Sequence, residues 1–140
     1  MLKISESFYS IQGEGPTMGH PSVFLRLSGC NLSCGGSDTV KTKQLDSNAT
    51  WRCDTIEQWI TGKRQSDENL IKEWEKKNYT THLKNGAHLI ITGGEPLLQQ
   101  KELVSFLIKL SESVDKSFIV EIETNGTIQP SSELNSLVSQ

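Results

Sequence analysis

Short apolar runs alternate along this chain with longer stretches in which apolar residues recur at helical spacing. Residues 3–12 alternate between apolar and polar and are rich in β-formers, so they predict a short strand. The run at 22–27 predicts a stronger strand, and the runs at 87–92 and 118–123 predict two strands of the buried type. The chain therefore supplies at least three apolar strands for one sheet.

Helical patterns occupy the segments between and after these strands. Each predicted helix has apolar residues on one face, and serine or aspartate stands where the second and the last would be capped. The predicted helices are 55–60, 66–77, 97–114 and one that begins near residue 131. Residues 35–52 are polar, rich in turn-formers and without an apolar period, so they predict a loop.

Strand, loop and helix follow one another three times, which is typical of a parallel sheet with right-handed crossovers. We therefore expect an α/β fold and a single domain over residues 1–140. In such sheets ligands bind at the carboxyl ends of the strands. Three segments with unusual chemistry fall at that edge: Gly29-Cys30, residues 93–96 and residues 124–127.

Charge and hydropathy argue against several classes of binding partner. The 140 residues carry a net charge of −3, which argues against a nucleic-acid surface. No apolar run approaches the roughly 20 residues of a membrane-spanning helix, and residues 1–7 lack the apolar stretch of a signal peptide. We therefore expect a cytoplasmic protein without a nucleic-acid or membrane partner.

The chain has three cysteines, Cys30, Cys34 and Cys53. An odd number of cysteines in such a chain favours metal or redox chemistry over disulfides. Three soft thiolates suit an iron–sulfur cluster. A [4Fe–4S] cluster with three cysteine ligands leaves one iron open to a small molecule. The residues alone also allow a small zinc site, with His20 as a further ligand, or a buried structural pair.

The Gly93-Gly94-Glu95-Pro96 turn combines two glycines with a carboxylate. Glycines let a backbone approach a ligand closely, and Pro96 suits the first position of a helix. Glu95 offers an acceptor to an ammonium group or a charge to a helix N-terminus. The alternative is an ordinary turn with a helix cap.

Four segments together resemble a known family: Gln12-Gly13-Glu14-Gly15, the strand and turn 24–30, Thr92 with the turn 93–96, and residues 123–127. They resemble the radical S-adenosylmethionine superfamily and, within it, the 7-carboxy-7-deazaguanine synthase family of queuosine and 7-deazaguanine biosynthesis. The resemblance spans nearly the whole chain. The glycine-rich turn is typical of the whole superfamily, whereas the Gln-Gly-Glu-Gly segment narrows the resemblance to the synthase family.

The resemblance implies a partial radical-SAM βα barrel and a lyase that converts 6-carboxy-5,6,7,8-tetrahydropterin to 7-carboxy-7-deazaguanine. The implied cofactors are a [4Fe–4S] cluster, S-adenosylmethionine and Mg²⁺, with an external electron donor. The chain is short for the family, so we expect an exposed sheet edge that a homodimer would cover. The alternatives are a glycyl-radical-activase-like protein and a non-catalytic remnant of the fold.

The resemblance also assigns roles to residues. The implied cofactor-binding residues are Gly93, Gly94, Glu95, Glu123, Thr124 and Asn125. The implied residues for the pterin substrate are Gln12, Glu14, Gly15, Arg26 and Thr92, with Arg26 as a clamp on its carboxylate. Thr55 is the implied Mg²⁺ ligand, and Thr39 is its substitute.

One departure from the family concerns the third cluster ligand. The family spaces its cysteines Cys-x3-Cys-x2-Cys, and here Ser37 stands at the third position. Residues 51–55 resemble the end of the same loop, so Cys53 is the alternative ligand and 35–52 would be an insertion. Widening the gap from two residues to 18 costs about 2 kcal/mol of loop closure. This is small beside the roughly 10–16 kcal/mol that structural zinc contributes to folding.

Overall fold

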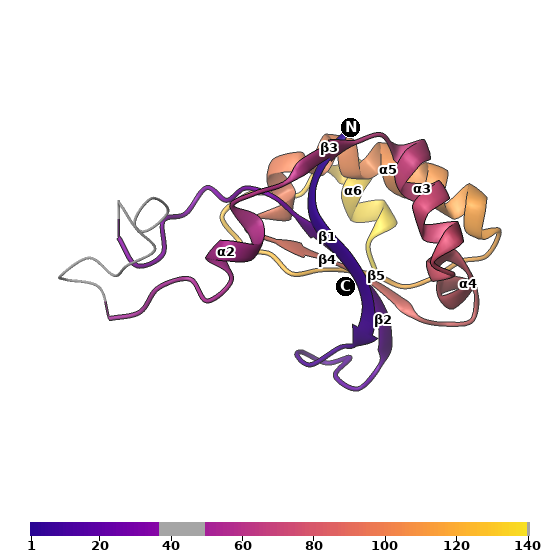
Figure 1. The fold of residues 1–140 in the computed structure, drawn as a ribbon, viewed down its shortest axis with the longest axis horizontal. Helices are drawn as coiled ribbons and strands as arrows, with labels where there is room; N and C mark the ends of the chain where they lie inside the picture. The colour runs from indigo at the N-terminus through magenta and orange to yellow at the C-terminus, as the bar shows by residue number, and fades with distance from the viewer. Residues whose placement is uncertain (37–49, 140) are drawn as a thin grey trace.

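The computed structural model describes residues 1–36 and 50–139 (Figure 1). The strands are β1 (Leu2–Ile11), β2 (Pro21–Leu27), β3 (Lys63–Gln65), β4 (His88–Gly93) and β5 (Val120–Ile122). The helices are α2 (Ile56–Trp59), α3 (Asp67–Lys76), α4 (Tyr79–Lys84), the 3-10 helix η1 (Pro96–Gln99), α5 (Gln100–Val114) and α6 (Ser132–Leu137). None of the helices in these described ranges is long and apolar enough to cross a membrane.

The five strands form one sheet in the order β3-β1-β2-β4-β5. Strands β2, β4 and β5 are parallel, with Arg26 beside Thr92 and Leu89 beside Val120. The α/β class is therefore confirmed. The parallel arrangement holds for these three strands, whereas β1 runs antiparallel to both β2 and β3.

Two elements were not predicted from the sequence. Strand β3 has three polar residues, so no apolar pattern marks it, and it forms by pairing with the start of β1. Helix α4 follows α3 after Asn78, whose left-handed φ of 61° ends one helix before the next begins. The helix predicted over 97–114 begins with the 3-10 turn η1, which has Pro96 at its start.

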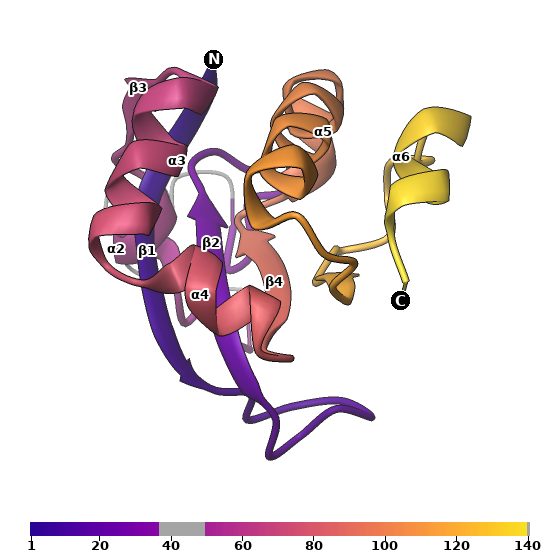
Figure 2. The same cartoon turned by 90° about the vertical axis from the view of Figure 1, so that its right-hand side faces the viewer.

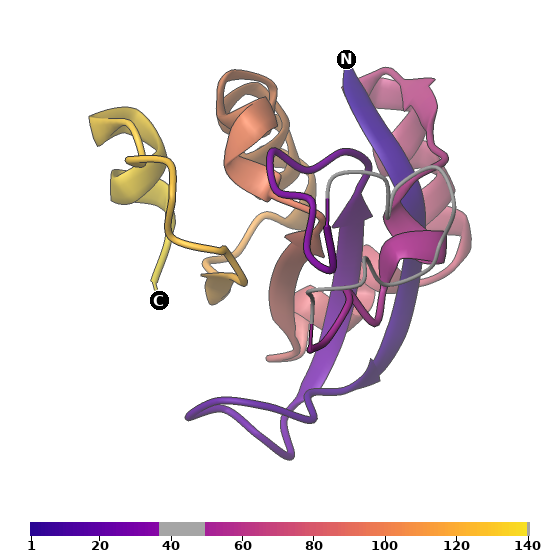
Figure 3. The same cartoon turned by 90° about the vertical axis from the view of Figure 1, so that its left-hand side faces the viewer.

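Helices cover one face of the sheet. Figure 2 shows α3, α4 and α5 in front of the strands, and Figure 3 shows the opposite side, where the strands and α2 face the viewer. The buried core between strands and helices includes Leu25, Leu89, Ile91, Trp74 and Phe106. Because side chains alternate along a strand, the strand neighbours of Leu25 and Ile91 point to the other face, and these neighbours include the predicted site residues Arg26 and Thr92.

Candidate functional site

The structure brings the three cysteines into one neighbourhood. Cys30 follows β2, directly after Gly29. The backbone N–H of Cys53 donates to the carbonyl oxygen of Cys34 at 3.3 Å, so the two ends of the intervening segment are joined. All three thiols are free and half-buried. The other candidates for this region, Ser37 and Thr39, lie outside the described residues.

The two other thiols influence the protonation of Cys34. Burial raises the pKa of Cys34 above its ordinary value, and the nearby thiolates of Cys53 and then Cys30 raise that pKa further. Gathering three thiolates is electrostatically unfavourable without a counter-charge. Bound metal cations would supply that charge, which is one respect in which these residues fit an iron–sulfur cluster.

Hydrogen-bond donors point at the sulfurs. The Leu32 N–H and the Trp59 Nε1–H lie 3.4 Å from the Sγ of Cys30 and of Cys53, respectively. The Asn125 side-chain amide reaches the Sγ of Cys30 at 3.9 Å. Hydrogen bonds to sulfur stabilise the thiolate and tune the potential of iron–sulfur clusters. Sequence reasoning missed Trp59, since its spacing on α2 marked it only as an apolar face residue.

Three cysteine thiols are suitable ligands for a cluster. In this structure, however, they are not close enough together to form a ready metal site. Within residues 1–36 and 50–139, no three His, Cys, Asp or Glu side chains form a group able to hold a metal ion as they stand. The loops that carry Cys34 and Cys53 would therefore have to adjust on loading. Such coupling between metal binding and local folding is common in small metal sites.

The Gly93-Gly94 turn lies directly against the loop of Cys30. A Cβ on Gly94 would overlap the Gly29 carbonyl oxygen and would lie 2.7 Å from the Cys30 Cβ. Gly93 has a φ of 151°, and a Cβ there would overlap the Leu27 backbone. Glycine is therefore needed at both positions, because the turn packs against the backbone that leads to Cys30.

The Glu95 carboxylate connects the ends of β4 and β5. It is 1% exposed and accepts the N–H of Leu97 at 2.8 Å, the N–H of Asn125 at 2.8 Å and the Thr124 hydroxyl at 2.9 Å. Three of the predicted cofactor residues therefore touch one another. In this structure Glu95 caps η1 and holds the 124–125 segment, and its contact with an ammonium group stays a prediction.

A small amide network extends this clamp to the cysteine loop. The Asn125 side chain donates to the Asn31 side-chain oxygen at 3.0 Å, and Asn31 donates to the Thr127 hydroxyl at 2.8 Å. The Gln99 side chain bonds the carbonyl oxygens of Lys3 and Ser28 at 3.1 Å. No sequence pattern signals these contacts, since they join residues far apart in the chain.

Most of the predicted substrate-binding residues line one pocket of about 350 Å³. It is lined by Gln12, Gly13, Glu14, Phe24, Arg26, Asp54, Thr55, Thr92, Gly93 and Glu123. Four of the five predicted substrate residues are in this set, together with the predicted Mg²⁺ ligand Thr55. Gly15 does not line the pocket and lies in the turn beyond Glu14 with a φ of 70°.

Polar side chains in and around the pocket are paired with one another. The Arg26 Nε donates to Glu6 Oε1 at 2.8 Å across the β1–β2 pair. This contact uses one of the five guanidinium N–H donors. The Gln12 side chain donates to Glu123 at 3.1 Å, which connects the end of β1 to the end of β5. The pocket therefore offers a cation, carboxylates and an amide to a ligand.

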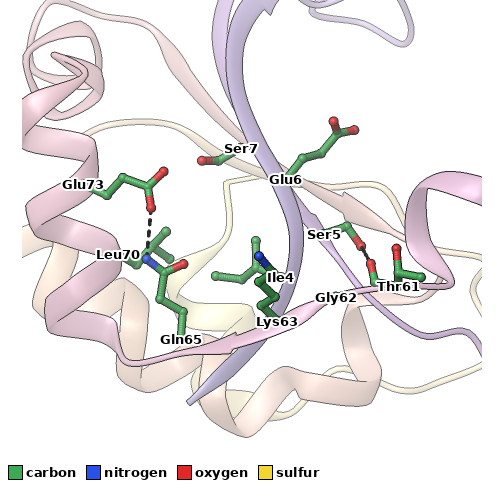
Figure 4. Close-up of a pocket in the computed structure, with 10 residues that line it drawn as sticks. All are labelled: Ile4, Ser5, Glu6, Ser7, Thr61, Gly62, Lys63, Gln65, Leu70 and Glu73. Carbon is green, nitrogen blue, oxygen red and sulfur yellow. Dashed lines mark hydrogen bonds between the residues drawn. The ribbon is translucent and has the colours of Figure 1, made fainter.

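A second and larger pocket, of about 490 Å³, lies where β1 leaves its pairing with β3 (Figure 4). Figure 4 shows Ser5 bonded to the Thr61 carbonyl and Gln65 bonded to Glu73, so four of its lining residues are paired with one another. The residues that line it include none of the predicted site residues. We place the functional site at the smaller pocket because the chemistry is gathered there.

Comparisons with known proteins show which proteins this chain resembles. Residues 11–138 match the sequence family described as "4Fe-4S single cluster domain". The chain is 36% identical over 140 residues to the 7-carboxy-7-deazaguanine synthase of Methanospirillum hungatei, covering 99% of this chain and 47% of that protein. It is 38% identical over 135 residues to the synthase of Clostridium acetobutylicum, covering 95% of this chain and 50% of that one.

A solved structure shows the same fold. The crystal structure of QueE from Escherichia coli matches with a TM-score of 0.61 and 29% identity, over 92% of this chain and 55% of that one. The predicted resemblance is therefore confirmed. The chain spans about half the length of the curated relatives that it matches.

Proposed function

Because this chain belongs to the 4Fe-4S single cluster domain family, we propose that it holds a [4Fe–4S] cluster and acts as a radical S-adenosylmethionine lyase. The relatives named 7-carboxy-7-deazaguanine synthase support the specific reaction, the conversion of 6-carboxy-5,6,7,8-tetrahydropterin to 7-carboxy-7-deazaguanine. A cluster of this kind supplies the electron that cleaves bound S-adenosylmethionine. An external electron donor and a homodimer belong to the same proposal.

The observation that carries this proposal is that the three cysteines lie in one neighbourhood and that the loop of Cys30 packs against the glycine turn. The charges of Cys53 and Cys30 raise the pKa of Cys34, and Gly94 packs against the loop of Cys30. Cys30, Cys34 and Cys53 would hold the cluster. Two successive glycines would let a cofactor approach the backbone of this turn closely.

The residues of the 350 Å³ pocket suit a carboxylated pterin. Arg26 would bind the carboxylate through guanidinium N–H groups that its contact with Glu6 does not use. Gln12 and Glu14 would bind the amide and amine edges of the ring, which need both donors and acceptors. Thr55 lines the same pocket and would contribute a hydroxyl to Mg²⁺ near the substrate.

The test is anaerobic reconstitution of the wild type and of Cys30→Ala, followed by two assays. Cleavage of S-adenosylmethionine in the presence of a reductant reports the cluster and cofactor side. Formation of 7-carboxy-7-deazaguanine from the carboxypterin reports the substrate side. We expect the wild type to perform both and Cys30→Ala to perform neither; a wild type that binds iron but cleaves no S-adenosylmethionine would contradict the proposal.

A further inference from the structure

The segment 12–20, which we call the 12–20 loop, connects β1 to β2 and carries three pocket residues, Gln12, Gly13 and Glu14. Backbone hydrogen bonds close its base: the Gln12 N–H donates to the His20 carbonyl at 2.9 Å, and the Gly19 N–H donates to the Gln12 carbonyl at 2.8 Å. Most of its residues are exposed. Its own backbone therefore fixes its shape, but contacts elsewhere must fix its position over the sheet.

Glu121 of β5 supplies the contact at the middle of the loop. Its carboxylate accepts the Thr17 hydroxyl at 2.7 Å, a hydrogen bond between residues 104 positions apart. The other oxygen of the same carboxylate lies 2.6 Å from His88 Nδ1. The side chains of His88 and Glu121 are only 6% and 9% exposed, so the carboxylate is held in one orientation.

A ring contact at the end of the loop involves the same histidine. The His20 ring stacks on the His88 ring with centroids 4.5 Å apart. At the beginning of the loop, Gln12 donates to Glu123, which directly follows β5 and lies two residues after Glu121. The 12–20 loop is thus attached at its start, middle and end, and the Glu121–His88 pair serves two of these attachments.

We propose that Glu121 is a positioning residue: held by His88, it binds Thr17 and thereby fixes Gln12 and Glu14 at the pocket. The predicted effect on catalysis rests on the proposed function. The predicted effect on the position of the loop does not depend on it. Without the contact the loop would occupy its binding-competent position for a smaller fraction of the time. The apparent affinity for the pterin falls by that fraction, while bound substrate reacts as before.

The experiment uses Thr17→Val, which removes the hydroxyl donor, and Thr17→Ser, which keeps it. Thr81→Val on the exposed part of α4 is the matched control. We expect faster amide hydrogen exchange at Gln12 and Gly19 in Thr17→Val alone. We also expect its KM for the carboxypterin to rise about tenfold at constant kcat, the change that follows the loss of one hydrogen bond to a charged group.

The exchange measurement does not depend on turnover, so the two proposals can fail separately. If the wild type does not convert the carboxypterin, the proposed function fails, and exchange at Gln12 and Gly19 still decides the role of Glu121. Unchanged exchange in Thr17→Val, or a Thr17→Ser variant as fast as Thr17→Val, would overturn the positioning role. An equal loss of kcat in all three variants would overturn its effect on the pocket.

Discussion

The Glu95 carboxylate accepts the backbone N–H of Asn125 at 2.8 Å and thereby joins the turns that follow β4 and β5. Removing it would leave the N–H of Leu97, which is buried, and the N–H of Asn125, which is partly buried, without their acceptor. Hydrogen bonds to a charged group contribute roughly 1.5–3 kcal/mol each, and unsatisfied buried donors carry a similar cost.

We therefore expect Glu95→Ala to lower the free energy of unfolding by about 3 kcal/mol. Urea denaturation followed by circular dichroism measures this. Glu112→Ala, on the exposed face of α5, is the control and is expected to change stability by less than about 0.5 kcal/mol. Equal losses in the two variants would show that the clamp contributes nothing of its own.

The identity of the third cluster ligand is decided by iron content. We expect reconstituted wild type and Ser37→Ala to retain about four irons per chain, as a cubane cluster requires. We expect Cys53→Ala to lose them, because a soft cluster iron prefers a thiolate to any remaining hard ligand. Iron and sulfide analysis with the visible spectrum measures this. Loss of iron in Ser37→Ala with retention in Cys53→Ala would identify Ser37 as the third ligand.

The packing of the glycine turn against the cysteine loop predicts a selective effect of one methyl group. We expect Gly94→Ala to destabilise the protein by about 1–3 kcal/mol, because its Cβ would overlap the Gly29 carbonyl and crowd Cys30. We also expect lower iron retention. Gly13→Ala is the matched control, since a Cβ there meets nothing within 4 Å; full iron retention in both variants would contradict this prediction.

The assignment of Arg26 to the substrate carboxylate predicts a loss specific to that carboxylate. We expect Arg26→Lys to raise the KM for the carboxypterin about tenfold, because an ammonium group cannot make the paired hydrogen bonds of a guanidinium. Binding of a pterin without the carboxylate, measured by calorimetry, is expected to be unaffected. Arg64→Lys, on exposed β3, controls for the loss of an arginine elsewhere.

The Glu73–Lys77 pair predicts a dependence of stability on pH. The hydrogen bond from Lys77, followed by that from Gln65, holds the pKa of Glu73 below its ordinary value of 4.5. Because the folded-state pKa is lowered, its contribution to stability is complete above pH 4.5 and disappears as pH falls through the folded-state pKa. Both side chains are substantially exposed, so the coupling is only about 0.5 kcal/mol.

A double-mutant cycle of Glu73→Gln and Lys77→Met measures this coupling by urea denaturation at descending pH. We expect it to be present at pH 7 and to approach zero well below the ordinary glutamate pKa. A coupling that stays constant at acidic pH would mean that packing, and not the charge of Glu73, connects the two residues.

Local patterns were sufficient to predict the apolar strands and the positions of their special turns. Gly29-Cys30 and Gly94 meet as expected because β2 and β4 are adjacent and parallel. The hydrogen bond from Trp59 to Cys53 and that from Thr17 to Glu121 could not be predicted. The first depends on how the residues before α2 fold back on that helix, and the second depends on where the 12–20 loop lies beside β5. Neither residue type nor spacing encodes these positions.

The Glu95 clamp has a consequence for the order of events during synthesis. Asn125 supports Asn31 in the first cysteine loop, and Glu95 holds Asn125 in turn. A ribosome must therefore translate past Asn125 before the loop of Cys30 acquires its final surroundings. Contacts of such long range form late because chain closure precedes them. The nascent chain consequently exposes the Cys30 loop without this support for several seconds of elongation.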